Sequence, residues 1–304
     1  MFNQPISGVV WPESLLQLTL GNAVNQPIIG VVWPPSLLHL TFGVGFNQPI
    51  IGVVWPASLL HLTFGDRFNQ QIIRVVWPAS LLQLILGDGF DQPITNVAWP
   101  ACLRQLTLGD RFNQPIIDVT WPTCLPLLAL GKRFNQPIAG VVWPASLLEL
   151  AFGESFNQPL MGVLWPASLN KLQFGESFNH PIIGVIWPVS LNKMQFGDRF
   201  NHPIAEAVWP SCLESLEFGR DFDQTLEGMK LPASLHCLMF HINFVDKEEE
   251  LDWPPSLFPK FKDTSYERGD ESDPLTVVAT FDKPTTILLE ELRVYTWPDF
   301  SIED

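Results

Sequence analysis

Charged residues are scarce in this chain, and their scarcity excludes one class of partner. Of 304 residues only 16% are charged, and the net charge is -15; ordinary globular proteins carry more charge. Between Ser14 and Gly65 there is no Asp, Glu, Lys or Arg at all. Nucleic acids are bound by clustered Lys and Arg. The composition therefore argues against a nucleic-acid partner.

Long hydrophobic runs are missing as well, although 46% of the residues are hydrophobic. Pro, Gly, Asn and Gln interrupt every apolar run well before the ~20 residues that a membrane helix needs. No basic-then-apolar leader precedes the first FNQPI string. The sequence thus predicts neither a membrane span nor a membrane partner, and the cytosol is the expected location.

Cysteine is rare, and its four copies form no metal-binding pair. Cys102, Cys124, Cys212 and Cys237 contain no C-x-x-C spacing. The first three stand in a column that is otherwise filled by Ser. Cys102 and Cys124 would lie on neighbouring repeats, close enough to cross-link in principle, but small buried thiols in a reducing compartment are the favoured interpretation.

What the chain has in abundance is one repeated unit, seen in its cleanest form in residues 46–65, FNQPIIGVVWPASLLHLTFG. The unit recurs every 22 residues without insertion, so that Trp stands in one column from Trp11 to Trp209, Leu231 keeps the phase and Trp253 restores the Trp. A period of this size is typical of a solenoid, whose repeats bury their apolar faces only by stacking.

Breakers within each unit exclude ordinary helices. Pro follows the Trp in all copies, and further Pro and Gly residues leave no window of more than about eight residues, whereas a typical helix needs about 11. In residues 59–65 Leu and Phe alternate with His61 and Thr63, which predicts a half-buried strand. GVVW is a plausible second extended segment. We predict a mainly β solenoid of about twelve rungs with parallel strands, held by internal columns of Trp, Leu, Phe and Ile, and an Asn column that hydrogen-bonds turn backbone.

FNQPI followed by WPxSLxxLxFG at this period resembles the FNIP repeat family, a relative of leucine-rich repeats. The resemblance covers residues 2 to about 262. It implies a right-handed, leucine-rich-repeat-like coil and a role in protein interaction. Some family members join these repeats to an F-box, which leaves a substrate-recognition module of a ubiquitin ligase as one alternative, although this chain carries no F-box.

Any functional site must lie in variable columns, because a residue present in every rung cannot be a unique catalytic group. Two variable columns flank the strand Leu and are expected to face outward, where they would bind a protein partner of unknown identity. The candidate partner-binding residues are Gln17, His39, Thr41, His61, Thr63, Gln83, Gln105, Glu149, Lys171, Gln173, Lys193 and Gln195. A merely solvated strand face is the plain alternative.

Other chemistries are weaker. A carbohydrate- or ice-binding solenoid is suggested by the Asn and Thr ladders, but Ile85 interrupts the latter. His39 with His61, and His180 with His202, would stack on adjacent rungs, yet no third ligand completes a metal site. Arg74, Asn96 and Asp118 replace Gly in three successive rungs and are expected to form a local ion-pair ladder. No phosphate loop, nucleophile-base pair or carboxylate cleft is present. We therefore predict no enzyme activity and no cofactor.

The two ends depart from the repeat. The first two rungs have no cap and a single charged residue, Glu13, which predicts self-association through rungs one and two. The pattern decays from Asp221, and from Asp246 onward there are sixteen acidic and six basic residues. We predict a solenoid in residues 1–262 and an acidic, β-rich cap in residues 263–304, with an exposed loop at YERGDESD and a degenerate repeat near FDKPT. Glu290, Glu291 and Tyr295 are the tail cluster to inspect.

Overall fold

The structure is a computed structural model that describes residues 2–224, 229–242, 261–267 and 275–281. Its described part contains strands and turns and no helix, so it offers nothing that could cross a bilayer as a helix. Each repeat contributes one short strand. Its central residue is the equivalent of Leu62, which lies between His61 and Thr63. These strands are β1 (Gln17–Thr19), β2 (His39–Thr41), β3 (His61–Thr63), β4 (Gln83–Ile85), β5 (Gln105–Thr107), β6 (Leu127–Ala129), β7 (Glu149–Ala151), β8 (Lys171–Gln173), β9 (Lys193–Gln195), β10 (Ser215–Phe218) and β11 (Cys237–Ile242).

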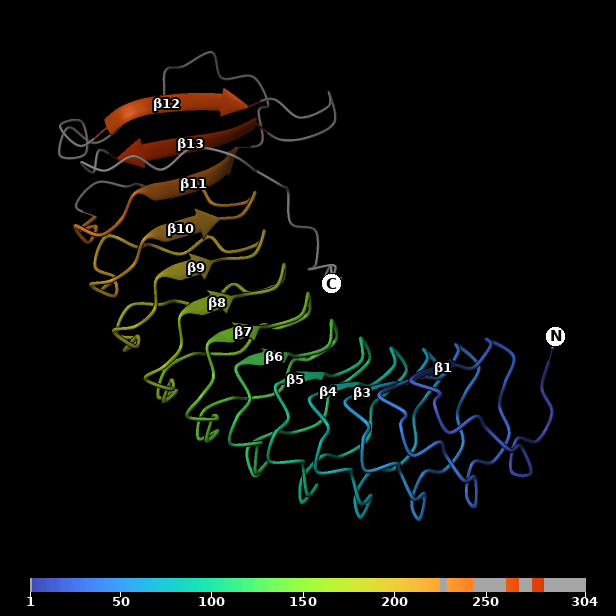
Figure 1. The fold of residues 1–304 in the computed structure, drawn as a ribbon. Coiled ribbons are helices and arrows are strands. Elements are labelled where there is room, and N and C mark those ends of the chain that lie inside the picture. Colours follow the sequence, from blue (N-terminus) through green and yellow to red (C-terminus); the bar gives the residue numbers. More distant parts are fainter. Residues whose placement is uncertain (1, 225–228, 243–260, 268–274, 282–304) are drawn as a thin grey trace.

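All these strands pair in parallel with the strand of the next repeat, and the register is one full repeat throughout. Leu40 lies beside Leu62, and Leu62 lies beside Leu84. The chain is thus a parallel, leucine-rich-repeat-like β-solenoid that follows a curved path (Figure 1). The number of turns is slightly below the predicted twelve within the described residues, because the copy around Trp253 lies outside them.

The sheet ends in two further strands, of which the one beside β11 runs the other way. β12 (Phe261–Glu267) and β13 (Leu275–Phe281) give the order β11-β13-β12, and both of these contacts are antiparallel. These two strands therefore lie beside the last described rung, and a cap in residues 263–304 stays a prediction. The exposed acidic loop, the degenerate repeat and the Glu290–Tyr295 cluster fall wholly or largely outside the described residues.

The core is a set of side-chain columns that run along the solenoid. Leu62, Phe64, Phe68 and Ile72 of one rung are at most 2% exposed, and the equivalent residues of neighbouring rungs stack on them. Trp55 lies face to face with Trp33 and Trp77, at centroid distances of 6.3 and 6.4 Å. Such aromatic burial removes roughly 150–250 Å² per ring from water. The predicted aromatic and aliphatic ladders are confirmed.

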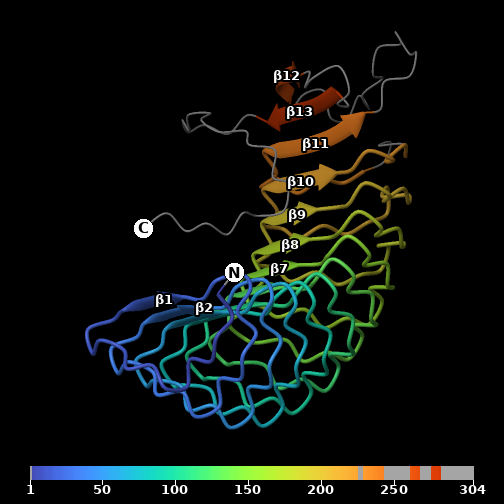
Figure 2. The same cartoon turned by 90° about the vertical axis from the view of Figure 1, so that its right-hand side faces the viewer.

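Ring spacings explain the curvature. Paired parallel strands lie about 4.8 Å apart. Phe42 and Phe64, next to the strands, are 5.3 Å apart, whereas Phe46 and Phe68, on the following segment, are 6.3 Å apart. The rungs therefore fan out with distance from the strands, which places the strands on the inner side of the curve, as Figures 1 and 2 show.

This fanning also explains why GVVW forms no second strand. At the Trp column the rungs are separated by about the same 6.3 Å, which is too wide for backbone hydrogen bonding between neighbouring strands. The structure has strands only on the inner side in its described rungs. Burial alternates along Val53, Val54 and Trp55, which is the pattern of an extended segment, but in the described rungs no inter-rung ladder joins GVVW to its neighbours.

The Asn column bridges the widened gap on the segment after the strand. Asn47 Oδ1 accepts a hydrogen bond from the backbone N–H of Asn69 in the next rung at 2.9 Å and another from Gln70 Nε2 at 2.9 Å. The pattern recurs along the solenoid, and Asp91 replaces Asn in it without breaking it. The Asn ladder is confirmed as a structural feature. The Asn side chains span the gap between neighbouring rungs and accept the hydrogen bond that a backbone carbonyl would accept in a strand.

The corner before VVW has a left-handed backbone, which accounts for its glycines. Gly30, Gly52, Gly140, Gly162 and Gly184 have φ between 80° and 87°. Arg74 and Asn96 occupy the same corner with φ of 72° and 63°, a region that costs non-glycine residues free energy. The salt bridges of the described residues include none between Arg74 and Asp118. The expected ion-pair ladder is therefore wrong, since these residues are two repeats apart.

Candidate functional site

The inner strand face brings the predicted partner-binding residues together in two straight columns. Gln17, His39, His61, Gln83 and Gln105 are register partners on β1–β5. The same column continues through Leu127, Glu149, Lys171 and Lys193 on β6–β9. Thr41 and Thr63 lie in the second column, which later holds Gln173 and Gln195. We call this two-column surface the strand face.

Exposure varies along the strand face, and one member is buried. Gln17, Glu149 and Lys193 are exposed, and most of the others are half-buried. Gln105 stands in the same outward-facing column but is only 7% exposed, because neighbouring side chains cover it. Its neighbour on the next strand is Leu127, which is large and only partly exposed, and this packing buries the amide.

A chain of polar side chains runs along the first part of the strand face. The rings of His39 and His61 stack at a centroid distance of 4.5 Å. His61 Nδ1 lies 2.8 Å from Gln83 Oε1, and Gln83 Nε2 donates to Gln105 Oε1 at 2.8 Å. The chain ends there, because Leu127 offers no acceptor, and Gln105 Nε2 has no hydrogen-bond partner in the described part of the chain.

Beyond Leu127 the strand face becomes charged. Glu149 and Lys171 on adjacent strands form an ion pair at 3.8 Å, and both side chains are nearly half exposed, so the pair contributes under about 1 kcal/mol. Lys193 follows Lys171 in register and makes no salt bridge with any described residue. Gln195 Nε2 donates to Glu217 Oε1 at 3.1 Å.

A hollow lies between these polar and charged parts. It is a cavity of ≈ 60 Å³ bounded by residues of β5–β8. Its cause is a loss of side-chain volume, since Thr107 and Gln173 in the second column are separated by Ala129 and Ala151 on the two strands between them. Sequence reasoning placed Leu127, Ala129 and Ala151 in the columns but not among the candidate residues. Two successive Ala residues in a column of larger side chains were the available signal.

Sequence reasoning also missed an apolar column on the outer side. Val54 lies between buried Val53 and Trp55 yet is 80% exposed, and its equivalents in seven other rungs are 74–95% exposed. This outer column comprises Val10, Val32, Val54, Val76, Val142, Leu164, Ile186 and Val208. The strict alternation of VVW would have indicated the outward residue. A long exposed apolar surface of this kind marks a possible contact site.

The rim after each strand is a solvated charge column. Lys132 lies 3.2 Å from Asp110 and 3.7 Å from Glu154, and the hydrogen bond that Lys132 donates to Asp110 raises the pKa of Lys132. Partial burial raises the pKa of Asp88, and the negative charges of Asp110 and Asp66 add to this. The rim is thus a row of partly exposed charges joined by weak ion pairs.

The cysteines correct the expectation of buried thiols. Cys102, Cys124 and Cys212 are exposed, Cys237 is intermediate, and all four are free. The column they share with Ser lies at the turn after the Trp-Pro step. There Ser58 Oγ donates to the Leu37 carbonyl of the preceding rung at 2.7 Å. Cys237 stands in the strand face instead, and burial raises its pKa.

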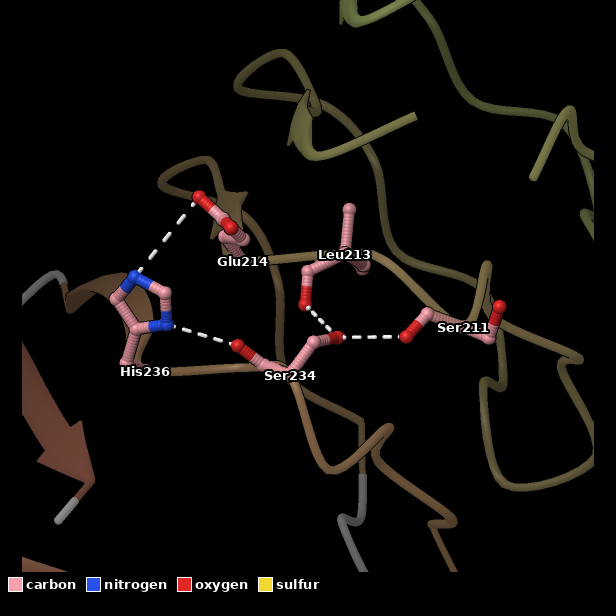
Figure 3. Close-up of polar contacts among 5 residues, drawn as sticks. All are labelled: Ser211, Leu213, Glu214, Ser234 and His236. Carbon is pink, nitrogen blue, oxygen red and sulfur yellow. Dashed lines mark hydrogen bonds and ion pairs between the residues drawn. The ribbon is translucent and has the colours of Figure 1, made fainter. Parts of the chain in front are cut away.

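One Ser, His and Glu group near β11 has the composition of a catalytic triad but not its geometry (Figure 3). Ser234 Oγ donates to the carbonyls of Leu213 at 2.7 Å and Ser211 at 2.9 Å. His236 Nδ1 bonds the backbone carbonyl of Ser234 at 2.7 Å, and its Nε2 lies 3.9 Å from Glu214. The imidazole contacts the Ser backbone rather than its hydroxyl, so this group links rungs and activates no nucleophile. No cluster of three or more metal ligands occurs in the described residues.

Comparisons with known proteins identify the repeat. The structure of CroV588, described as a novel circular LRR protein, is 35% identical, with a TM-score of 0.43 over 74% of this chain and 43% of that chain, so this chain spans less than half of its length. An internalin (inlF) from Listeria monocytogenes is 15% identical, with a TM-score of 0.44 over 76% of this chain and 83% of that one. No curated protein matches. The FNIP Repeat model matches residues 2–45, 46–89, 134–177, 156–198, 178–221 and 200–243, which is more than half of the chain. The chain belongs to the FNIP repeat family.

Proposed function

We propose that this chain is a non-enzymatic scaffold that binds a protein partner on its strand face. The observation that carries the proposal is the contrast between constant and variable columns. The Leu, Phe, Ile and Trp columns are buried and nearly uniform, whereas the strand face changes from His and Gln through Leu and Ala to Glu and Lys. A rigid scaffold that displays changing side chains in fixed register is suited to recognition.

The outer column is the competing surface, because it is more apolar and more exposed than the strand face. It is also more uniform from rung to rung, since all its members are Val, Leu or Ile and only Ala98 and Thr120 interrupt it between Val10 and Val208. Such uniformity gives little basis for choosing one partner over another, since specificity needs differences among contacts. We therefore place partner selection on the strand face.

The test compares two variants that carry four substitutions each. One carries His39→Ala, His61→Ala, Lys171→Glu and Lys193→Glu on the strand face. The other carries Val32→Thr, Val54→Thr, Val76→Thr and Val142→Thr on the outer column. Proteins captured on the native chain and both variants are quantified by mass spectrometry, after thermal unfolding has shown that the variants are folded.

We expect a partner that the native chain and the outer-column variant retain and that the strand-face variant loses. Loss on the outer-column variant alone would move the interaction to the outer side. A partner retained equally by all three chains would contradict both surfaces. Self-association through the first rungs stays a separate prediction, for which light scattering across a dilution series is the measurement.

A further inference from the structure

We propose that the cavity between β5 and β8 is an anchor site that takes one apolar side chain from an acidic segment of a protein partner. The inference rests on the proposed function and locates the central contact of the partner-binding surface. It follows from three independent observations on the strand face, which concern the shape, the hydrogen bonding and the charge of the same few rungs.

The shape comes from the second column. Ala129 and Ala151 leave a cavity of ≈ 60 Å³ between the larger side chains of Thr107 and Gln173. One water needs about 10–15 Å³ of such space, so the cavity has room for several waters or for a single aliphatic side chain. Leu127 and the buried strand leucines contribute its apolar wall. An apolar side chain is the occupant that such a wall favours.

The hydrogen bonding comes from Gln105, which lines the same cavity. Its side chain is more than nine-tenths buried, and its Nε2 has no partner within the described residues. Gln83 Nε2 donates toward the next strand, to Gln105 Oε1. That contact occupies Gln105 Oε1 and leaves Nε2 as a free donor that is covered by protein atoms. A buried donor without an acceptor is costly, and a rotation of the Gln105 side chain into the cavity would let a carbonyl oxygen of the partner satisfy it.

The charge comes from Lys171, which lines the cavity together with Glu149, and from Lys193 on the next rung. Lys171 and Lys193 are register neighbours on β8 and β9. Lys171 has only the long, half-exposed contact to Glu149, and Lys193 has no carboxylate within salt-bridge distance among the described residues. Two like charges placed side by side on a sheet are unfavourable, so a carboxylate from the partner is the complementary group. The partner segment is therefore apolar at one position and acidic at another.

The spacing of the rungs sets the distance between these two positions. The lysines lie one to three strands beyond Ala129 and Ala151, which is roughly 5–15 Å at the strand spacing of a parallel sheet. An extended peptide rises about 3.3 Å per residue. We therefore expect a Leu, Ile, Met or Phe with an Asp or Glu about two to four positions away.

The probe is a random heptapeptide library displayed on phage and selected against the full chain. The expected consensus is an apolar residue with an acidic residue at the stated spacing. Ala129→Leu with Ala151→Leu fills the cavity and should weaken the best soluble peptide by about tenfold or more, as loss of an apolar pocket does. Ala57→Leu with Ala79→Leu is the matched control, because it makes the same exchange on two neighbouring rungs, at exposed positions in the turn after Trp-Pro and outside the strand face.

A second variant keeps the test informative should the filled chain fail to fold. Leu127→Ala widens the cavity and should shift the selected apolar residue toward Phe or Trp, which a purely structural role would not do. Lys171→Glu with Lys193→Glu should remove the acidic residue from the consensus, and should leave the apolar residue in it.

The outcomes separate this inference from the proposed function. Peptides that bind the filled and widened chains as they bind the native one, yet lose binding with His39→Ala and His61→Ala, would overturn the cavity as anchor while keeping the strand face. Peptides that no strand-face substitution affects would overturn both proposals. A consensus without an apolar residue would overturn the anchor directly.

Discussion

Backbone conformation distinguishes residues that stand in one column and look equivalent in sequence. Arg74 and Asn96 are the only described non-glycine residues with positive φ, and they occupy the corner where most rungs have Gly. Asp118 stands in the same column but does not share this conformation. An L-residue loses about 1–2 kcal/mol in the left-handed region, and Asn loses less than Arg.

Arg74→Gly is therefore expected to raise the free energy of unfolding by about 1 kcal/mol, and Asn96→Gly by less. Asp118→Gly is the control. It removes no left-handed strain and gives the unfolded chain more freedom, so it should lower the free energy of unfolding by up to about 1 kcal/mol. Urea denaturation midpoints measure all three, and an equal gain from Asp118→Gly would contradict the explanation.

Single residues also show where sequence reasoning ended. The column of Gln105 was predictable from the 22-residue period, but its burial was not, because burial depends on how the Leu127 side chain packs against it. Cys102 and Cys124 were predicted in the right column and with the wrong exposure, since composition favours buried thiols while the turn after Trp-Pro lies at the surface. Position in a column follows from spacing, and exposure follows from packing.

At the scale of the rung, a second glycine column sets how closely the turns stack. A Cβ placed on Gly109 would collide with the backbone carbonyl of Gly87 in the preceding rung, and Gly65, Gly131 and Gly153 are in the same position. Gly21, in the same column of the first rung, has nothing within 4 Å of such a Cβ. Here glycine is needed for close approach rather than for a positive φ.

Gly109→Ala is thus expected to lower the free energy of unfolding by about 2–3 kcal/mol, because backbone atoms of two rungs have to move apart. Gly21→Ala is expected to change it by less than about 0.5 kcal/mol, as other surface substitutions do. Thermal unfolding followed by circular dichroism compares the two variants. Similar losses in both would show that the column acts through local conformation instead of stacking.

The elements themselves were largely predictable. An unbroken period requires every parallel strand to pair with a shift of one repeat, and the alternation around Leu62 identifies the strand face. Only the inner strand becomes a ladder, however, because Phe and Trp rings hold the outer parts of the rungs about 6 Å apart. The sequence indicates that the rings stack. It does not give the distance between stacked rings relative to the distance between strands, and that difference determines the direction of curvature.

For the whole molecule, the edge of the last parallel strand matters most for whether the chain stays monomeric. β11 pairs with β10 on one side and with β13 on the other, along six residues from Cys237 to Ile242. Without β13, this strand would present a row of free N–H and C=O groups, and such edges pair with other chains. The predicted capping role of the segment after residue 262 can be tested on this basis.

Removal of residues 261–304 is expected to leave the solenoid folded and to make it associate as its concentration rises. The control is the same truncated chain with Met239→Lys, which puts a charge on the exposed edge strand and should restore the monomer. Multi-angle light scattering on full-length, truncated and truncated-plus-lysine chains gives the masses, and near-ultraviolet circular dichroism shows whether the Trp column is intact.

A truncated chain that stays monomeric at every concentration would mean that β11 is protected by its own twist or length. Association that the lysine does not reverse would place the contact elsewhere, with the exposed outer column as the next surface to vary.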